Sequence, residues 1–124
     1  SLFSRVTGKY NPHPFEIGHP LEDGEKVTVG NLEVTAFDVP GHTPGSGAYL
    51  AQGVLYVGDA AMIGSSQKVL GPVKAFSTDA AQGVASLKHL AEELQPRAGE
   101  VKLLATAHSG GVAGLAPLTA FGKE

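Results

Sequence analysis

The chain has 124 residues, with 9 Lys and Arg against 12 Asp and Glu, 17 Gly, 8 Pro, 5 His and no Cys, and its formal net charge is −3. A chain of this length can bury one modest core, so we expect a single domain or half-domain over residues 1–124. The lack of a basic cluster argues against nucleic-acid binding, and the lack of cysteine excludes disulfides, iron–sulfur clusters and a cysteine nucleophile.

No segment approaches the ~20 apolar residues that a membrane-spanning helix needs, and we expect a soluble, cytoplasmic protein. Residues 1–23 contain three X-Pro steps and little periodicity, which predicts an irregular leader. Two β-hairpins are predicted next, because apolar residues alternate with polar ones on both sides of Gly30-Asn31 and again around Gln52-Gly53.

A helix is predicted to begin at Asp79, with Gln82 three residues later as in a capped helix start. Its apolar residues recur at intervals of three and four until Pro96. Residues 101–105 predict a buried strand, and residues 115–122 a short final helix. The order of these elements predicts an α+β fold, a sheet with helices on one face.

Three of the predicted strands are followed at once by a turn that carries a metal-capable side chain. These side chains are His42, Asp59 and His108, each with glycine nearby in the sequence. Loops at the ends of strands commonly carry functional groups, and two imidazoles with one carboxylate are reasonable zinc ligands. With no cysteine in the chain, any metal must be held by nitrogen and oxygen.

The string Gly-His-Thr-Pro-Gly-Ser at residues 41–46, the Val-Gly-Asp at 57–59 and the His-Ser-Gly at 108–110 resemble the second half of the metallo-β-lactamase superfamily of metal-dependent hydrolases. The resemblance spans roughly residues 25–121 and implies half of an αββα sandwich. It also implies that His42 belongs to a first metal site, that Asp59 bridges two metals, and that His108 belongs to the second site.

The same resemblance implies a binuclear zinc centre, with iron or manganese as alternatives, that turns bound water into hydroxide near neutral pH. Gly58 would permit the tight turn that presents Asp59, and either Thr43 or Ser46 would orient His42.

The hallmark His-x-His-x-Asp-His segment of this superfamily is missing, because no two of the five histidines are separated by a single residue. Each metal site then keeps two protein ligands, whereas a catalytic zinc normally has three. We therefore expect the C-terminal half of an ester, thioester or lactone hydrolase, inactive by itself. The absent initiator Met and the short length favour the same hypothesis. Either the missing N-terminal half or a second identical chain would cover the sheet.

Two alternatives compete with this interpretation. A non-catalytic structural or interaction module on the same scaffold explains the missing ligands equally well. A serine hydrolase would use Ser46 or Ser109, although neither lies in a Gly-x-Ser-x-Gly motif. The remaining histidines, His13, His19 and His89, are expected in turns or on the surface.

Overall fold

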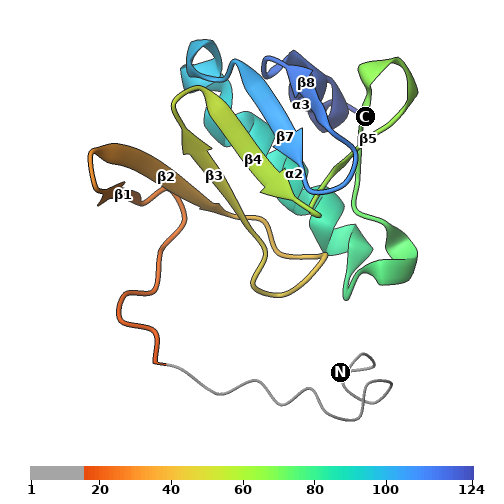
Figure 1. The fold of residues 1–124 in the computed structure, drawn as a ribbon. Coiled ribbons are helices and arrows are strands. Elements are labelled where there is room, and N and C mark those ends of the chain that lie inside the picture. The colour runs from red at the N-terminus through yellow and green to blue at the C-terminus, as the bar shows by residue number, and fades with distance from the viewer. Residues whose placement is uncertain (1–15) are drawn as a thin grey trace.

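The computed structural model describes residues 16–124, which form a six-stranded sheet, a small two-stranded sheet and two α-helices (Figure 1). The large sheet has the order β1-β2-β3-β4-β7-β8. Its strands are β1 (Lys26–Val29), β2 (Leu32–Asp38), β3 (Gly47–Ala51), β4 (Val54–Gly58), β7 (Leu103–Thr106) and β8 (Gly111–Ala113). The small sheet pairs β5 (Met62–Ile63) with β6 (Val69–Leu70), and the helices are α2 (Ala80–Leu94) and α3 (Ala116–Gly122). Three short 3₁₀ helices, η1 (Ser65–Gln67), η2 (Lys74–Phe76) and η3 (Gln95–Glu100), complete the fold.

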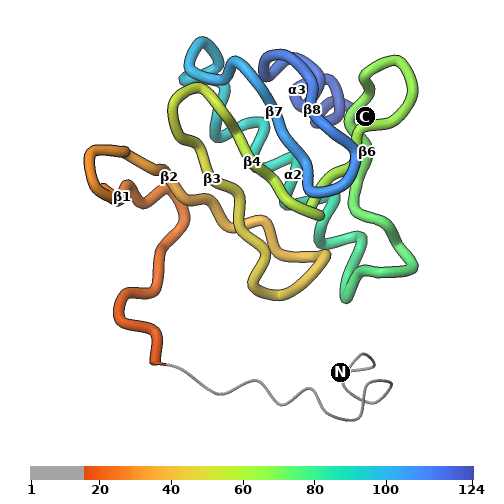
Figure 2. The backbone as a smooth tube through the Cα atoms, in the orientation of Figure 1, coloured from red at the N-terminus to blue at the C-terminus, as the bar shows by residue number. Residues whose placement is uncertain are grey.

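The large sheet is mixed. Its neighbouring strands are antiparallel except for β4 and β7, which run parallel and are joined through α2. Figure 2 shows these two strands side by side although they lie far apart in the sequence. Both α-helices lie behind the sheet in Figure 1. The expectation of an α+β fold, a sheet with helices on one face, is thus confirmed.

The two predicted hairpins are present, and local backbone geometry explains the second. Gln52 and Gly53 both have positive φ, at 47° and 82°, as a tight two-residue hairpin turn requires. The turn fixes the register that places Ala51 opposite Val54 and Tyr49 opposite Tyr56.

The core lies between the sheet and the two helices. Alternate residues of the central strands, such as Leu50, Leu55 and Leu104, are at most 5% exposed. They belong to one apolar cluster with Leu87 of α2 and Leu118 of α3. The carboxylate of Asp79 accepts a hydrogen bond from the Gln82 amide at 2.9 Å, so the capped start predicted for α2 is confirmed.

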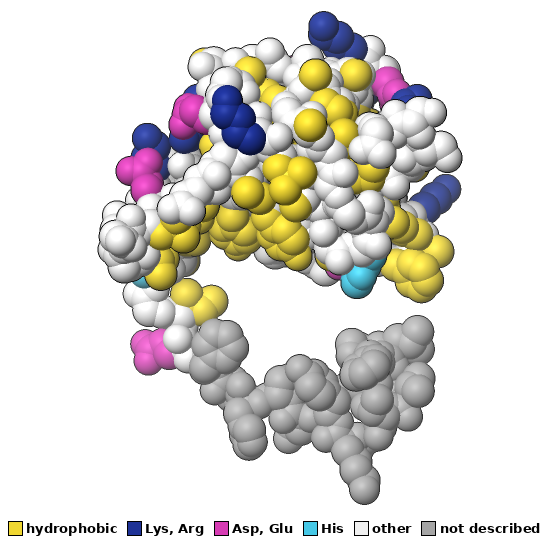
Figure 3. Space-filling model, turned by 45° about the horizontal axis from the view of Figure 1, so that its top comes forward, with side chains coloured by type: hydrophobic (Ala, Val, Ile, Leu, Met, Phe, Trp, Pro, Cys, Tyr) yellow, Lys and Arg dark blue, Asp and Glu magenta, His cyan; other side chains and the backbone are white. Residues whose placement is uncertain are grey.

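The opposite face of the sheet is apolar and open. Tyr49, Val54, Tyr56 and Leu103 are between 37% and 44% exposed, and strand register makes them neighbours. Figure 3 shows hydrophobic side chains gathered in a band on one side of the molecule. Large open apolar faces are uncommon on isolated soluble domains.

Several elements depart from the predictions. The strand expected from residue 101 begins at Leu103, because Val101 instead closes the η3 turn through a hydrogen bond to Ala98. The short strands β5, β6 and β8 were not predicted, since runs of two or three residues leave no periodic pattern. Residues 16–23 form no helix or strand, and the rest of the expected leader, including His13, lies outside the described residues. None of the helices among residues 16–124 is long and apolar enough to cross a membrane.

Candidate metal centre

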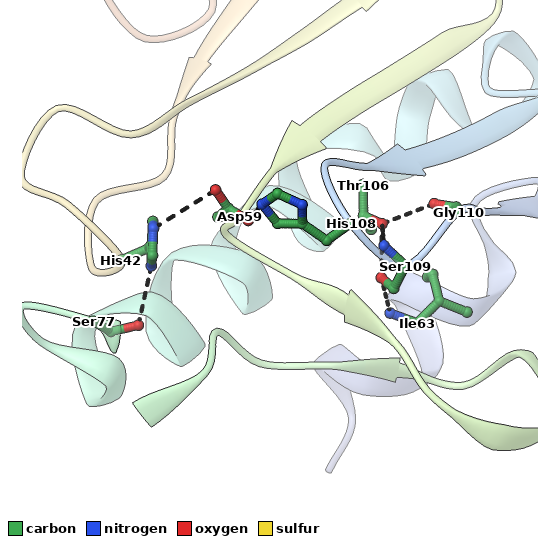
Figure 4. Close-up of polar contacts among 8 residues, drawn as sticks. All are labelled: His42, Asp59, Ile63, Ser77, Thr106, His108, Ser109 and Gly110. Carbon is green, nitrogen blue, oxygen red and sulfur yellow. Dashed lines mark hydrogen bonds and ion pairs between the residues drawn. The ribbon is translucent and has the colours of Figure 1, made fainter. Parts of the chain in front are cut away.

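Three loops place His42, Asp59 and His108 at one end of the sheet (Figure 4). His42 lies between β2 and β3, Asp59 directly follows β4, and His108 lies just after β7. Because β4 and β7 are parallel neighbours, their carboxyl ends meet at the same edge. The Ala107 amide donates to the Gly58 carbonyl at 2.9 Å, which ties the two loops together.

The two imidazoles approach different oxygens of one carboxylate. His42 Nε2 lies 3.8 Å from Asp59 Oδ2, and His108 Nε2 lies 3.2 Å from Asp59 Oδ1. All three side chains line one pocket of about 370 Å³, together with Met62, Val73 and Phe76. Gly58 has a φ of +58°, so the tight turn expected at this glycine is present.

The His42 loop is held against the start of α2. Asp79 N–H donates to the Gly41 carbonyl at 2.8 Å, and Thr78 N–H donates to the His42 carbonyl at 3.0 Å. Gly41 has a φ of +144°, and a Cβ there would lie 2.2 Å from the backbone nitrogen of Gly83. Only a glycine at position 41 allows this close contact between loop and helix.

Ser77, just after η2, orients the His42 ring. The Ser77 hydroxyl donates to the Val73 carbonyl at 2.6 Å and lies 3.3 Å from His42 Nδ1. Because the only proton of the hydroxyl is directed at the carbonyl, Ser77 must accept from Nδ1–H. This tautomer leaves the Nε2 lone pair of His42 free to face the pocket, as a metal-ligating histidine requires.

The expectation that Thr43 or Ser46 orients His42 is wrong. The hydroxyls of Thr43 and Ser46 lie 2.8 Å apart and bind each other, and Ser46 Oγ also accepts from the Thr43 amide at 3.1 Å. These contacts close the turn within the loop. Ser77 is separated from His42 by four strands and two 3₁₀ helices, so no local pattern in the sequence points to it.

The His108 loop has its own hydroxyl network. Thr106 Oγ1 donates to the Gly110 carbonyl at 2.8 Å, and it lies 2.7 Å from Ser109 Oγ. Ser109 therefore donates to Thr106, and it accepts from the Ile63 amide at 2.8 Å. With both serine hydroxyls engaged in loop structure, the geometry gives no support to a serine nucleophile at Ser46 or Ser109.

The three residues of the site do not converge on one point. Among residues 16–124, the group of three ligand atoms that lie within 4.8 Å of one another is a different one, formed by Asp23, His89 and Glu93. His89 and Glu93 lie on α2, where His89 Nε2 lies 3.3 Å from Glu93 Oε2, and Asp23 precedes β1. Burial, followed by the nearby Asp23 carboxylate, raises the pKa of Glu93. His19 is likewise outside the site, paired with Glu25.

Comparison with known proteins finds relatives that match part of their length. No family model matches the sequence. Over 79 residues the chain is 33% identical to a hydroxyacylglutathione hydrolase of Aeromonas salmonicida, and over 76 residues it is 41% identical to a hydroxyacylglutathione hydrolase of Halorhodospira halophila. These alignments cover 64% and 60% of this chain but only 31% and 28% of the relatives.

Comparison of the fold with solved structures agrees with the sequence comparison. A metallo-β-lactamase family protein of Thermus thermophilus aligns with a TM-score of 0.60 and 26% identity, over 90% of this chain and 36% of its own. The chain has the metallo-β-lactamase fold and is similar in sequence to members of that superfamily. An archaeal member of that superfamily, from Sulfolobus tokodaii, has a TM-score of 0.60 and 19% identity, and the match covers 97% of this chain but 45% of the archaeal protein.

The resemblance seen in the sequence is thus confirmed, and the described fold corresponds to half of the metallo-β-lactamase sandwich. Superfamily members bind metal ions, generally zinc. The structure brings together the three predicted ligands of this metallo-β-lactamase homologue, each from its own loop. Their role as metal ligands stays a prediction.

Proposed function

We propose that this chain supplies part of a binuclear metal site, generally zinc, in a hydrolase that cleaves esters, thioesters or lactones. The observation that carries the proposal is the placement of the two oxygens of Asp59, each facing a different imidazole in one pocket. A carboxylate in this position suits a bridge between two cations better than a ligand to one. His42 and His108 would each hold one of the two ions.

The donor chemistry fits such a centre. Imidazole and carboxylate suit zinc, and iron or manganese are the alternatives. Ser77 keeps the proton of His42 on Nδ1 and so aims the Nε2 lone pair at the pocket. A bound metal of this kind lowers the pKa of water toward neutrality and polarises a carbonyl group. Each of the two ions would still need ligands beyond these three residues.

The reaction class is supported by the relatives. The matched proteins of Aeromonas and Halorhodospira are hydroxyacylglutathione hydrolases, which act on a thioester. The matched stretch covers less than a third of each relative. The substrate class that we propose therefore includes esters, thioesters and lactones.

Metal content and activity of the full gene product test the proposal. We expect stoichiometric zinc, iron or manganese by elemental analysis, together with hydrolysis of simple thioesters or esters. His42→Ala and His108→Ala should each lower the metal content and reduce kcat/KM by at least about a hundredfold, since a ligand and its ion are lost together. His19→Ala is the matched control, because His19 binds Glu25 outside the pocket. A double His42/His108 variant that keeps its full metal content would refute the ligand assignment, and a metal-free gene product would support the non-catalytic module.

We also propose that the open sheet face is covered by the other half of the sandwich. The four partly exposed residues of this face are Tyr49, Val54, Tyr56 and Leu103, and none of them is charged. The solved relatives extend to about twice the length that this chain matches, which provides a second half of suitable size. Two such faces in contact form the core of a sheet-on-sheet sandwich.

Substitution on this face tests the contact. In the full gene product, Tyr56→Asp should lower the free energy of unfolding by about 2 kcal/mol or more, because a charge would be buried. Leu70→Asp is the control, since Leu70 is 43% exposed but lies on β6, away from this face. Equal, small effects of both changes would contradict the proposal. A dimer of this chain in analytical ultracentrifugation would instead indicate a second copy as the cover.

A further inference from the structure

The pocket that holds His42, Asp59 and His108 has one polar side and one apolar side. Every other residue that lines it is apolar, namely Met62, Val73 and Phe76. Phe76 stands out because 77% of it is exposed, the largest value among the exposed large hydrophobic residues of 16–124. Covering this exposed phenyl ring with an apolar group of a ligand would remove apolar surface from water, which is favourable.

The backbone of the turn that carries Phe76 is held by hydrogen bonds. The Phe76 amide donates to the Val73 carbonyl at 3.1 Å, which closes the η2 turn. The same carbonyl accepts from Ser77, whose hydroxyl also holds His42. One short turn therefore carries both Phe76 and the serine that contacts the His42 ring. A group that binds against Phe76 lies in the same pocket as the candidate metal ligands.

Met62, another residue of this apolar side, is also on an anchored segment. Met62 begins β5, whose neighbour Ile63 donates its amide to Ser109 Oγ at 2.8 Å, next to His108. Leu70, 43% exposed, pairs with Met62 across the small sheet. Apolar side chains thus continue outward from the site toward β6.

We propose that this apolar wall binds the acyl chain of the substrate and that Phe76 determines acyl-chain preference. The inference rests on the proposed function. The substrate class is an uncharged, medium-length acyl thioester or ester with its carbonyl at His42, Asp59 and His108. Water adds to the carbonyl carbon, the bond from that carbon to sulfur or oxygen breaks, and the thiol or alcohol leaves with a proton while the acid keeps the added oxygen.

The charges around the pocket favour an uncharged acyl group. No Lys or Arg is among the residues of 16–124 that line the pocket. Lys68, on the loop before β6, is paired with the Glu124 carboxylate at 2.9 Å. Lys74 lies on the η2 turn itself without lining the pocket, so an anionic acyl chain is the competing possibility that the experiment must address.

A series of thioesters of N-acetylcysteamine, with acetyl, butanoyl, hexanoyl and succinyl groups, tests the proposal on the full gene product. The released thiol is measured with a chromogenic disulfide. We expect kcat/KM to rise from acetyl to hexanoyl by on the order of tenfold, because each added methylene gains apolar contact. Phe76→Ala should reduce that preference to about twofold or less, because the loss of kcat/KM should be larger for the hexanoyl than for the acetyl substrate. Val29→Ala, an exposed apolar residue on β1, should leave the preference unchanged.

The outcomes separate this inference from the proposed function. Unchanged preference in Phe76→Ala, an equal loss for all four substrates, or a succinyl group preferred over hexanoyl would each overturn the acyl-wall inference while hydrolysis itself persists. Absence of hydrolysis by the unaltered protein, with metal content insensitive to His42→Ala, would overturn the proposed function. Zinc content of Phe76→Ala, expected to equal that of the unaltered protein, checks that the site remains assembled.

Discussion

Replacing Ser77 tests how the His42 ring is held. Ser77→Ala removes two hydrogen bonds at once, the 2.6 Å bond to the Val73 carbonyl and the 3.3 Å contact with His42 Nδ1. A typical hydrogen bond contributes about 0.5–1.5 kcal/mol net, and only the second bond acts on the ring directly. Since about 1.4 kcal/mol corresponds to a tenfold change, we expect metal affinity to fall by on the order of tenfold.

Two measurements in the full gene product check this expectation. Competition with a chromophoric chelator gives the metal affinity of the unaltered protein, of Ser77→Ala and of Ser77→Thr, whose hydroxyl restores both bonds. Nitrogen-15 chemical shifts of the metal-free protein report which nitrogen of His42 carries the proton. We expect Nδ1–H in the unaltered protein and in Ser77→Thr, and a mixture of tautomers in Ser77→Ala.

Ser65→Ala is the control, because Ser65 is also a serine on an exposed 3₁₀ turn but lies away from His42. The reasoning is wrong if Ser77→Ala keeps both the affinity and the Nδ1–H tautomer. It is equally wrong if Ser77→Thr behaves like Ser77→Ala, because the effect would then come from the shape of the turn rather than from the hydroxyl.

Three further predictions concern stability, each read from the midpoint of urea unfolding. Gly41→Ala should destabilise by about 3 kcal/mol or more, because the new Cβ would lie 2.2 Å from Gly83 N at a φ of +144°, whereas Gly45→Ala, with nothing within 4 Å, should change little. Asp79→Ala should cost about 1 kcal/mol through loss of the helix cap, and Asp79→Asn much less. The raised pKa of Glu93 means that folding favours its protonated form. The stability that the protonated carboxyl contributes is therefore fully present below pH 4.5 and is lost as the pH rises through the folded-state pKa. Glu93→Gln should therefore stabilise at pH 7 relative to pH 4, and an equal effect at both pH values would contradict this.

Much of the fold follows from short-range patterns. The hairpin turn at Gln52-Gly53 and the capped start of α2 at Asp79 are set by neighbouring residues, so sequence reasoning finds them. The same holds for the position of Asp59 after a glycine with positive φ. The strands β5 and β8 are too short to show a period, and each is recognised only by its pairing with a strand elsewhere in the chain, β5 with β6 and β8 with β7.

In the candidate site, too, the features set by neighbouring residues could be predicted and those set by distant contacts could not. His42, Asp59 and His108 were identified because each follows a strand and matches a family pattern. Ser77 and Phe76 were not, because their roles depend on the η2 turn folding back onto the His42 loop. That contact is made by residues 35 positions apart, and no periodicity or spacing rule reports it.

The parallel pairing of β4 with β7 also determines when the site can form during synthesis. Asp59 emerges from the ribosome well before His108, and the two meet only after α2 has crossed over and β7 has been added to the sheet. Bringing such a distant pair together costs loop-closure entropy, so we expect this contact to form late in folding. An ion that needs both side chains therefore cannot stabilise early folding intermediates. Its binding free energy stabilises only chains in which the crossover is complete.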